Sequence, residues 1–144
     1  MDNNQRKIWL GGNILPVNDA KINVLSPTSQ FGLNVFEGIR CYWSDKKQQL
    51  YAFRLDDHFK RLHQSIKLMR MNSPYSTEDL RKGFFDVIKA NNYTEDIAVR
   101  QTVFVDGVGG TWNSTEPVNM FIAPISKHFT PITDKKGIRC QISS

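Results

Sequence analysis

Residues 31–43, FGLNVFEGIRCYW, bring an arginine, aromatic side chains and a glycine into one short stretch. The two-residue period of a β-strand divides these side chains between two faces. One face carries two aromatic rings, a glycine and a cation: Phe36, Gly38, Arg40 and Tyr42. The other carries an acid among apolar residues: Val35, Glu37, Ile39 and Cys41. The first face suits an anionic, partly planar small molecule.

A second strand, residues 96–105, also has an arginine in its middle. One face is apolar, and the other holds Ala98, Arg100, Thr102 and Phe104. An arginine within a strand is costly unless it is paired or binds a ligand. For Arg40 or Arg100 alone, an ion pair with Glu37 or a nearby aspartate is the favoured interpretation. Two such strands together favour a shared anion site, because the planar guanidinium binds carboxylates through two hydrogen bonds.

Other candidate residues carry weaker signals. Arg61 lies beside the apolar stripe of its helix and, taken alone, is typical of a solvated arginine. The glycine-rich run of residues 106–112 resembles a phosphate loop only loosely, since no helix follows Gly110. The three histidines show no metal-ligand spacing, so no metal site and no catalytic histidine are predicted. We expect Cys41 and Cys140 to be buried thiols.

The hydrophobic periodicity predicts the elements that position these residues. Two helices are expected, over residues 56–71 and from Ser76 to about Asn91, with Asp79 completing a cap at Ser76. Strands are expected over residues 7–10, 14–17, 22–25, 39–43, 50–53, 96–105, 118–125 and 138–142. This order predicts an α+β fold, an antiparallel-rich sheet with two helices packed on one side.

Composition narrows the functional class. The 144 residues carry a net charge of +5, but the cations are spread along the chain and mixed with acids, which argues against nucleic-acid binding. No stretch approaches the length of an apolar membrane span, and the start, MDNNQRKIWLGG, lacks the apolar segment of a secretory signal. We expect a single domain in the cytoplasm.

Four motifs in this order resemble class IV aminotransferases, with branched-chain-amino-acid aminotransferases as the nearest match. They are FGLNVFEGIRCY, LYAFRLDDHFKRLHQSIKLMRM, IAVRQTVFVDGVGG and KGIRCQISS. The resemblance covers residues 8–144 and matches only the N-terminal domain of that family. It implies residues 1–144 as the N-terminal, small domain of the family fold. The family uses pyridoxal 5′-phosphate, bound to a lysine as a Schiff base, to move an amino group between an amino acid and a 2-oxo acid such as 2-oxoglutarate.

The resemblance also implies roles for individual residues. Arg61 matches the arginine that binds the cofactor phosphate. Phe36, Gly38 and Arg40 match positions that line the substrate pocket, and Arg100 matches the arginine that receives the distal carboxylate of glutamate. The loop of Gly107, Val108, Gly109 and Gly110 matches one that reaches the neighbouring subunit, which implies a homodimer.

Departures from the family pattern leave the substrate open. The substrate position Phe31 and also Ala98 stand where branched-chain enzymes have tyrosines, and Ser126 stands where they have a tryptophan. None of the eleven lysines matches the Schiff-base lysine, so we expect no catalytic residue within residues 1–144 and no activity of this chain alone. The alternatives are a non-catalytic binding or dimerisation module, a D-amino-acid aminotransferase, or an aminodeoxychorismate lyase.

Overall fold

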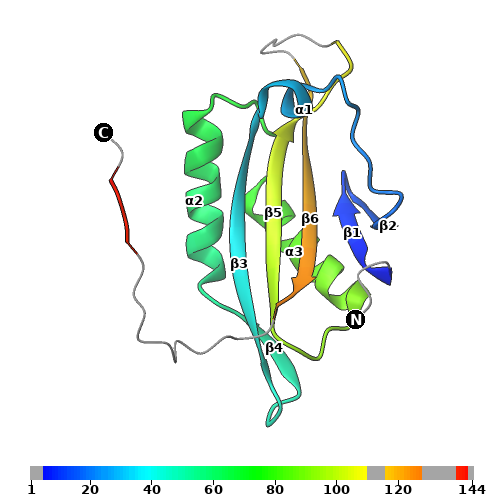
Figure 1. Ribbon diagram of the computed structural model, residues 1–144. Helices are drawn as coiled ribbons and strands as arrows, with labels where there is room; N and C mark the ends of the chain where they lie inside the picture. Colours follow the sequence, from blue (N-terminus) through cyan, green and yellow to red (C-terminus); the bar gives the residue numbers. More distant parts are fainter. Residues whose placement is uncertain (1–4, 110–115, 128–138, 143–144) are drawn as a thin grey trace.

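One six-stranded antiparallel sheet organises the chain. The computed structural model describes residues 5–109, 116–127 and 139–142. The strand order is β2-β1-β6-β5-β3-β4 (Figure 1). The strands are β1 (Lys7–Leu10), β2 (Asn13–Pro16), β3 (Asn34–Ser44), β4 (Gln49–Ala52), β5 (Ile97–Val105) and β6 (Val118–Ser126). The predicted α+β class is confirmed, and every strand pairing in the described residues is antiparallel.

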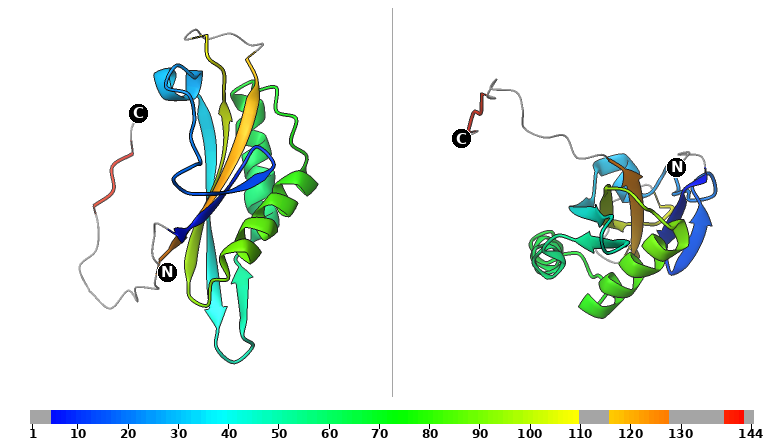
Figure 2. Two further views of the ribbon diagram at one scale, coloured as in Figure 1. Left: turned by 90° about the vertical axis from the view of Figure 1, so that its right-hand side faces the viewer. Right: turned by 90° about the horizontal axis from the view of Figure 1, so that it is seen from below.

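Two long helices cover one face of this sheet. α2 (Leu55–Leu68) packs on β3, and α3 (Thr77–Asn91) packs on β1 and β6. Seen from below, both helices lie on the same side of the strands (Figure 2). No helix of the described residues covers the centre of the opposite face (Figure 2). Arg40 and Arg100 lie on this opposite face. We call this second surface the open face.

The core lies between the helices and the sheet. The helical stripes bury Phe59, Leu62, Ile66, Leu80, Phe84 and Val87. They meet the apolar face of the sheet, which buries Ile39, Cys41, Val99, Val103, Met120 and Ile122. Phe59 and Phe84 meet edge to face, with ring centroids 6.3 Å apart, and join the two helices. The apolar stripe of α2 does not continue to Met69, which follows the last helical residue and is exposed.

The ends of α3 follow the sequence signals. The Ser76 hydroxyl accepts a hydrogen bond from the backbone N–H of Asp79, and the Asp79 carboxylate accepts one from the backbone N–H of Ser76. These reciprocal bonds satisfy donors that a helix start leaves free. Asn92 ends the helix in the left-handed conformation, with φ of 51°.

Two predicted strands are wrong. Residues 22–25 form no strand, because Ser26 caps a short helix instead, α1 (Pro27–Phe31), with Pro27 at its first turn. Gly32 then takes a φ of 68° and lets the chain turn into β3 at Asn34. Phe31 therefore belongs to α1 and does not continue the strand. Residues 139–142 are not in a strand either, and Ile138 lies outside the described residues.

The two cysteines also differ from each other. Cys41 is fully buried, and burial raises the pKa of its thiol to about 12. Such a thiol stays protonated at neutral pH and is unreactive. Cys140 is exposed, so the prediction that both thiols are buried is wrong for this residue.

α3 lies close to β1 and β6 at Gly83. A Cβ built on this glycine would lie 2.8 Å from Ile122 Cδ1 and 3.1 Å from Trp9 Cε2. Both neighbours are buried, so a side chain at residue 83 would have to displace them from their places in the core. The close contact therefore favours glycine at this position.

We expect Gly83→Leu to lower the free energy of unfolding by about 1–2 kcal/mol, because overpacking outweighs the gain in helix propensity. Urea unfolding followed by circular dichroism measures this loss. The matched control is Lys89→Leu, at an exposed position of the same helix. Equal stability of the two variants would contradict this packing argument.

Candidate functional site

The pairing of β3 with β5 places each arginine opposite a small residue on the open face. Gly38 pairs with Arg100, and Arg40 pairs with Ala98. Successive positions on this face are two residues apart, so the two arginines are diagonal neighbours. The open face carries Phe36, Gly38, Arg40 and Tyr42, as the strand period predicts. On the open face, an arginine therefore lies next to a small residue both along each strand and across the two strands.

Both guanidinium groups rest over aromatic rings. The Cζ of Arg100 lies 5.0 Å from the ring centroid of Phe36, and the Cζ of Arg40 lies 5.5 Å from that of Tyr42. These cation–π contacts hold the cations in place and use no carboxylate. Within residues 5–109, 116–127 and 139–142, neither arginine has an ion-pair partner. The predicted pairing with Glu37 is therefore wrong for both, because Glu37 lies on the opposite face.

A hollow of about 330 Å³ lies over this alternation, and we call it the cationic hollow. Its lining residues are Gly38, Arg40, Ala98, Val99, Arg100, Ile125 and Lys127. A Cβ built on Gly38 would meet no atom within 4 Å, so the space above this residue is open. The hollow thus combines three cations with room for a small ligand.

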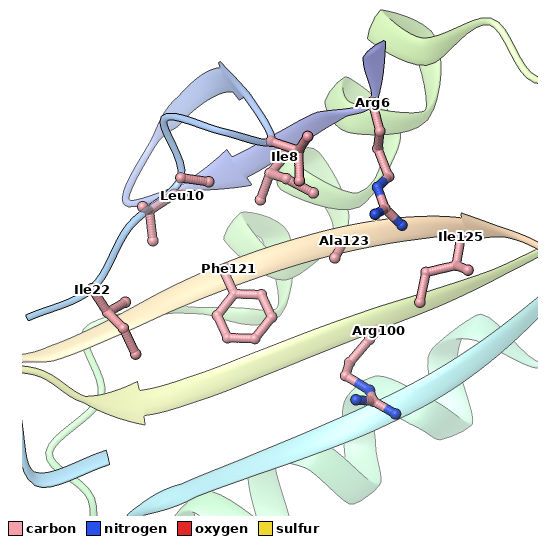
Figure 3. Close-up of a pocket in the computed structure, with 10 residues that line it drawn as sticks. Arg6, Ile8, Leu10, Ile22, Arg100, Phe121, Ala123 and Ile125 are labelled. Carbon is pink, nitrogen blue, oxygen red and sulfur yellow. The ribbon is translucent and has the colours of Figure 1, made fainter. Parts of the chain in front are cut away.

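An apolar hollow of about 380 Å³ lies beside it and shares Arg100 and Ile125 with it. Figure 3 shows its wall of Ile8, Leu10, Ile22 and Phe121. The guanidinium of Arg100 extends from β5 toward β3, so the arginine presents its charge to the cationic hollow (Figure 3). The aliphatic part of the Arg100 side chain borders the apolar hollow.

Arg61 belongs to a different cluster, on the helix side of the sheet. Glu37 is 97% buried, as its exposed fraction of 3% shows, yet it carries a carboxylate. Arg61 donates from Nε to Glu37 Oε1 at 2.6 Å and from Nη2 to Oε2 at 2.5 Å. The Nδ1 atom of His58 lies 2.7 Å from Oε2. Arg61 therefore pairs with a buried acid, although its side chain stays about two-thirds exposed, as its helix position indicates.

The charge state of Glu37 follows from these partners. Burial by itself raises the pKa of a carboxyl group, but the hydrogen bonds and charges of Arg61 and His58 outweigh it and hold the pKa of Glu37 below its usual value of 4.5. The same contact raises the pKa of Arg61. Glu37 is thus a buried carboxylate that α2 neutralises.

The remaining predicted residues lie apart from the cationic hollow. Phe31 lies half-exposed at the end of α1. Gly107, Val108 and Gly109 follow the end of β5, where Gly107 has a φ of 121° and its backbone N–H donates to Asp106 Oδ1. A side chain at Gly107 would overlap the carboxylate of Glu116. Gly110 lies outside the described residues.

The sequence reasoning missed the pairing of Glu37 with Arg61 and the presence of Lys127 at the cationic hollow. Glu37 carried a usable signal, since an acid on an apolar strand face needs a partner. Lys127 carried none, because its place depends on the pairing of β6 with β5, in which Ser126 lies opposite Ile97 and Lys127 follows it. In the described ranges, no group of three or more His, Cys, Asp or Glu could hold a metal ion. Nor does any helix in those ranges have the length and apolarity that crossing a membrane requires.

We expect the free energy of unfolding to depend on pH through the cluster of Glu37, Arg61 and His58. The pKa of Glu37 is lower in the folded than in the unfolded chain, so its stabilising effect is present above about pH 4.5 and is lost as the pH falls through the folded value. Urea unfolding between about pH 6 and pH 3 should show a shallower loss for Glu37→Gln than for the unsubstituted chain. Asp57→Asn, which removes an exposed pair with Arg54 on the same helix, should change the profile less. Identical profiles for Glu37→Gln and the unsubstituted chain would contradict the assignment.

Comparison with known proteins places the chain in a family. Residues 34–144 match the family model of amino-transferase class IV. A branched-chain-amino-acid aminotransferase of Escherichia coli is 39% identical over 102 residues, which are 71% of this chain and 32% of the relative. A probable branched-chain-amino-acid aminotransferase of Aquifex aeolicus is 27% identical over 92% of this chain and 43% of the relative.

Solved structures agree with this match. The branched-chain aminotransferase of Thermoproteus uzoniensis with norvaline superposes with a TM-score of 0.78 and 35% identity, over 84% of this chain and 40% of that chain. The Escherichia coli branched-chain amino acid aminotransferase gives a TM-score of 0.76 and 34% identity, over 85% and 40%. The chain thus spans well under half of the length of these relatives. Its fold and its sequence together show that the chain belongs to the class IV aminotransferase family.

Proposed function

We propose that the chain is the N-terminal domain of a pyridoxal-phosphate-dependent aminotransferase that moves an amino group between a branched-chain-like amino acid and 2-oxoglutarate. The observation that carries the substrate side of this proposal is a pair of arginines on the open face, Arg40 and Arg100. Each lies opposite a small residue and has no carboxylate partner among the described residues. A 2-oxo acid or an amino acid brings the carboxylate that such arginines bind. In this proposal the full-length protein acts in the cytoplasm as a homodimer.

Arg61 fits the phosphate of the cofactor. A guanidinium has five N–H donors, and Glu37 occupies two of them, on Nε and Nη2. Three donors remain on a side chain that is about two-thirds exposed. Glu37 also fixes the plane of the guanidinium, so these donors keep one direction. A phosphate needs such a preorganised group of donors.

The open face would bind the substrate. Arg100 would receive the distal carboxylate of glutamate or 2-oxoglutarate, with its guanidinium held over Phe36. Phe36, Gly38 and Arg40 would form the wall of the pocket, with Phe31 at its margin. The loop of Gly107, Val108, Gly109 and Gly110 would reach the neighbouring subunit. When bound, the cofactor supplies an electron sink for the bond changes at the substrate Cα.

The Schiff-base lysine is assigned to the part of the relatives that this chain does not span. Lys60 and Lys67 lie on α2 with exposed side chains, and we propose neither as the Schiff-base lysine. We therefore propose that residues 1–144 alone do not catalyse transamination.

The direct test extends the chain past Ser144 to the length of its relatives. We expect the extended protein to bind pyridoxal 5′-phosphate, with a visible absorbance band, and to transfer amino groups to 2-oxoglutarate, whereas residues 1–144 show no turnover. Amino-acid-dependent formation of glutamate measures the activity. An extended protein that binds no cofactor would favour the non-catalytic module.

The role of Arg61 can be tested with the phosphate-free cofactor. In the extended protein, Arg61→Ala should weaken pyridoxal 5′-phosphate binding by about tenfold or more and leave pyridoxal binding nearly unchanged, since a charged hydrogen bond contributes about 1.5–3 kcal/mol. Equilibrium titration with each compound gives the two dissociation constants. The matched control is Arg54→Ala, at the start of the same helix. Equal losses for both compounds would argue for a structural role of Arg61.

A further inference from the structure

Two side chains of α2 share one oxygen of Glu37. The Nδ1 atom of His58 lies 2.7 Å from Glu37 Oε2, and Arg61 Nη2 donates to the same oxygen at 2.5 Å. His58 and Arg61 are three positions apart, so both lie on the side of the helix that packs on β3. We call these three residues the Glu37 cluster. Its central carboxylate is thus contacted by two side chains that can each carry a positive charge.

The hydrogen bonds determine where His58 carries its first proton. Glu37 is a carboxylate at neutral pH, because its pKa is held below the usual value of 4.5. A carboxylate only accepts hydrogen bonds, so the Nδ1 atom of His58 is the donor. The Nε2 atom of His58 has no hydrogen-bond partner among the described residues, and a second proton there makes His58 a cation.

The net charge of the Glu37 cluster depends on this second proton. With a neutral His58, the charges of Arg61 and Glu37 cancel. A phosphate at the free donors of Arg61 is then attracted by the guanidinium and repelled by the carboxylate beside it. With a protonated His58, the cluster carries one net positive charge, and two cations share the carboxylate. The protonated form therefore attracts a dianion more strongly than the neutral form does.

The neighbouring charged groups do not replace this proton. Opposite Glu37, on the covered face of β5, lies the uncharged Gln101. Aspartate, lysine and arginine side chains keep their charge between about pH 5.5 and 8.5. Those in the first turns of α2, on β3 and at the contact with α3 are Arg40, Arg54, Asp56, Asp57, Lys60 and Arg81. His63, also on α2, contacts Thr77 of α3 instead, with its Nε2 atom 3.1 Å from the Thr77 hydroxyl.

We propose that His58 is a positioning residue for the cofactor phosphate, and that its protonated form gives the Glu37 cluster the positive charge with which Arg61 holds that phosphate. This inference rests on the proposed aminotransferase function and adds a linkage between the phosphate and a proton. His58 acts through Glu37 and does not itself touch the phosphate. Because linkage is reciprocal, a bound dianion in turn favours the proton on His58.

Sulfate is the probe that tests this linkage without the cofactor. It keeps two negative charges between about pH 5.5 and 8.5, whereas the second pKa of a phosphate ester is about 6. Sulfate is added to the 144-residue chain at constant ionic strength, and the Cζ signal of Arg61 is followed by NMR. We expect the sulfate concentration needed for half of the shift to be about threefold or more higher at pH 8.5 than at pH 5.5.

Three variants separate the charge of His58 from its hydrogen bond. His58→Asn keeps an N–H donor near the place of Nδ1 but cannot become a cation, so its sulfate affinity should be low at both pH values. His58→Lys stays charged at both and should also lose the pH dependence, with the higher affinity. The matched control is His63→Asn on the same helix, which should keep it. A pH dependence that persists in His58→Asn, or an Arg61 signal that sulfate does not move, would overturn the inference.

The extended protein distinguishes this inference from the proposed function. At about pH 6.5, His58→Asn should weaken pyridoxal 5′-phosphate binding by about threefold or more and leave pyridoxal binding unchanged, while His63→Asn should change neither. Equilibrium titration gives these dissociation constants. If His58→Asn binds pyridoxal 5′-phosphate as tightly as the unsubstituted protein and transfers amino groups to 2-oxoglutarate, the inference is wrong and the aminotransferase proposal stands. Equal losses for both compounds would assign His58 a merely structural role and would also overturn the inference.

Discussion

The register between β3 and β5 is the constraint on which the rest of the structure depends. Eight residue pairs fix it, from Asn34 opposite Phe104 to Cys41 opposite Ile97. A slip of one residue would turn every side chain of one strand to the other face, and it would bury arginines under α2. The apolar residues of the covered face, such as Ile39 and Val99, prevent this slip. The core therefore sets the position of Arg40 and Arg100, although neither arginine is part of the core.

The charged residues of β3 lie on opposite faces, with Glu37 on the covered face and Arg40 on the open face. Glu37 is the only acid in the strand, and its burial requires compensation, which α2 provides through Arg61 and His58. Because Glu37 lies on the covered face, it does not neutralise Arg40 or Arg100 on the open face. The ion-pair cluster thus stabilises the contact between α2 and β3, while no carboxylate of the described residues lines the cationic hollow on the other side of the sheet.

Local sequence patterns predicted the faces of β3 and β5, both long helices and the α3 cap, because these depend on periods and caps within one segment. They failed where a distant partner decides the structure. Residues 22–25 are apolar enough for a strand, but no neighbouring strand pairs with them, and the cap at Ser26 begins α1. Likewise, the place of Lys127 depends on the pairing of β6 with β5, which the period of β6 alone does not encode. The partner of Glu37 comes from another element, 24 positions along the chain.

The cationic hollow borders an apolar surface. The neighbouring apolar hollow shares Arg100 and Ile125 with it, so Arg100 has apolar side chains on one side. Attraction between opposite charges grows as the local dielectric constant falls. In the proposed function, a ligand that covers both hollows would exclude water from Arg100 and strengthen its attraction to a carboxylate. The apolar wall of Ile8, Leu10 and Phe121 would then contribute to anion binding together with the arginine.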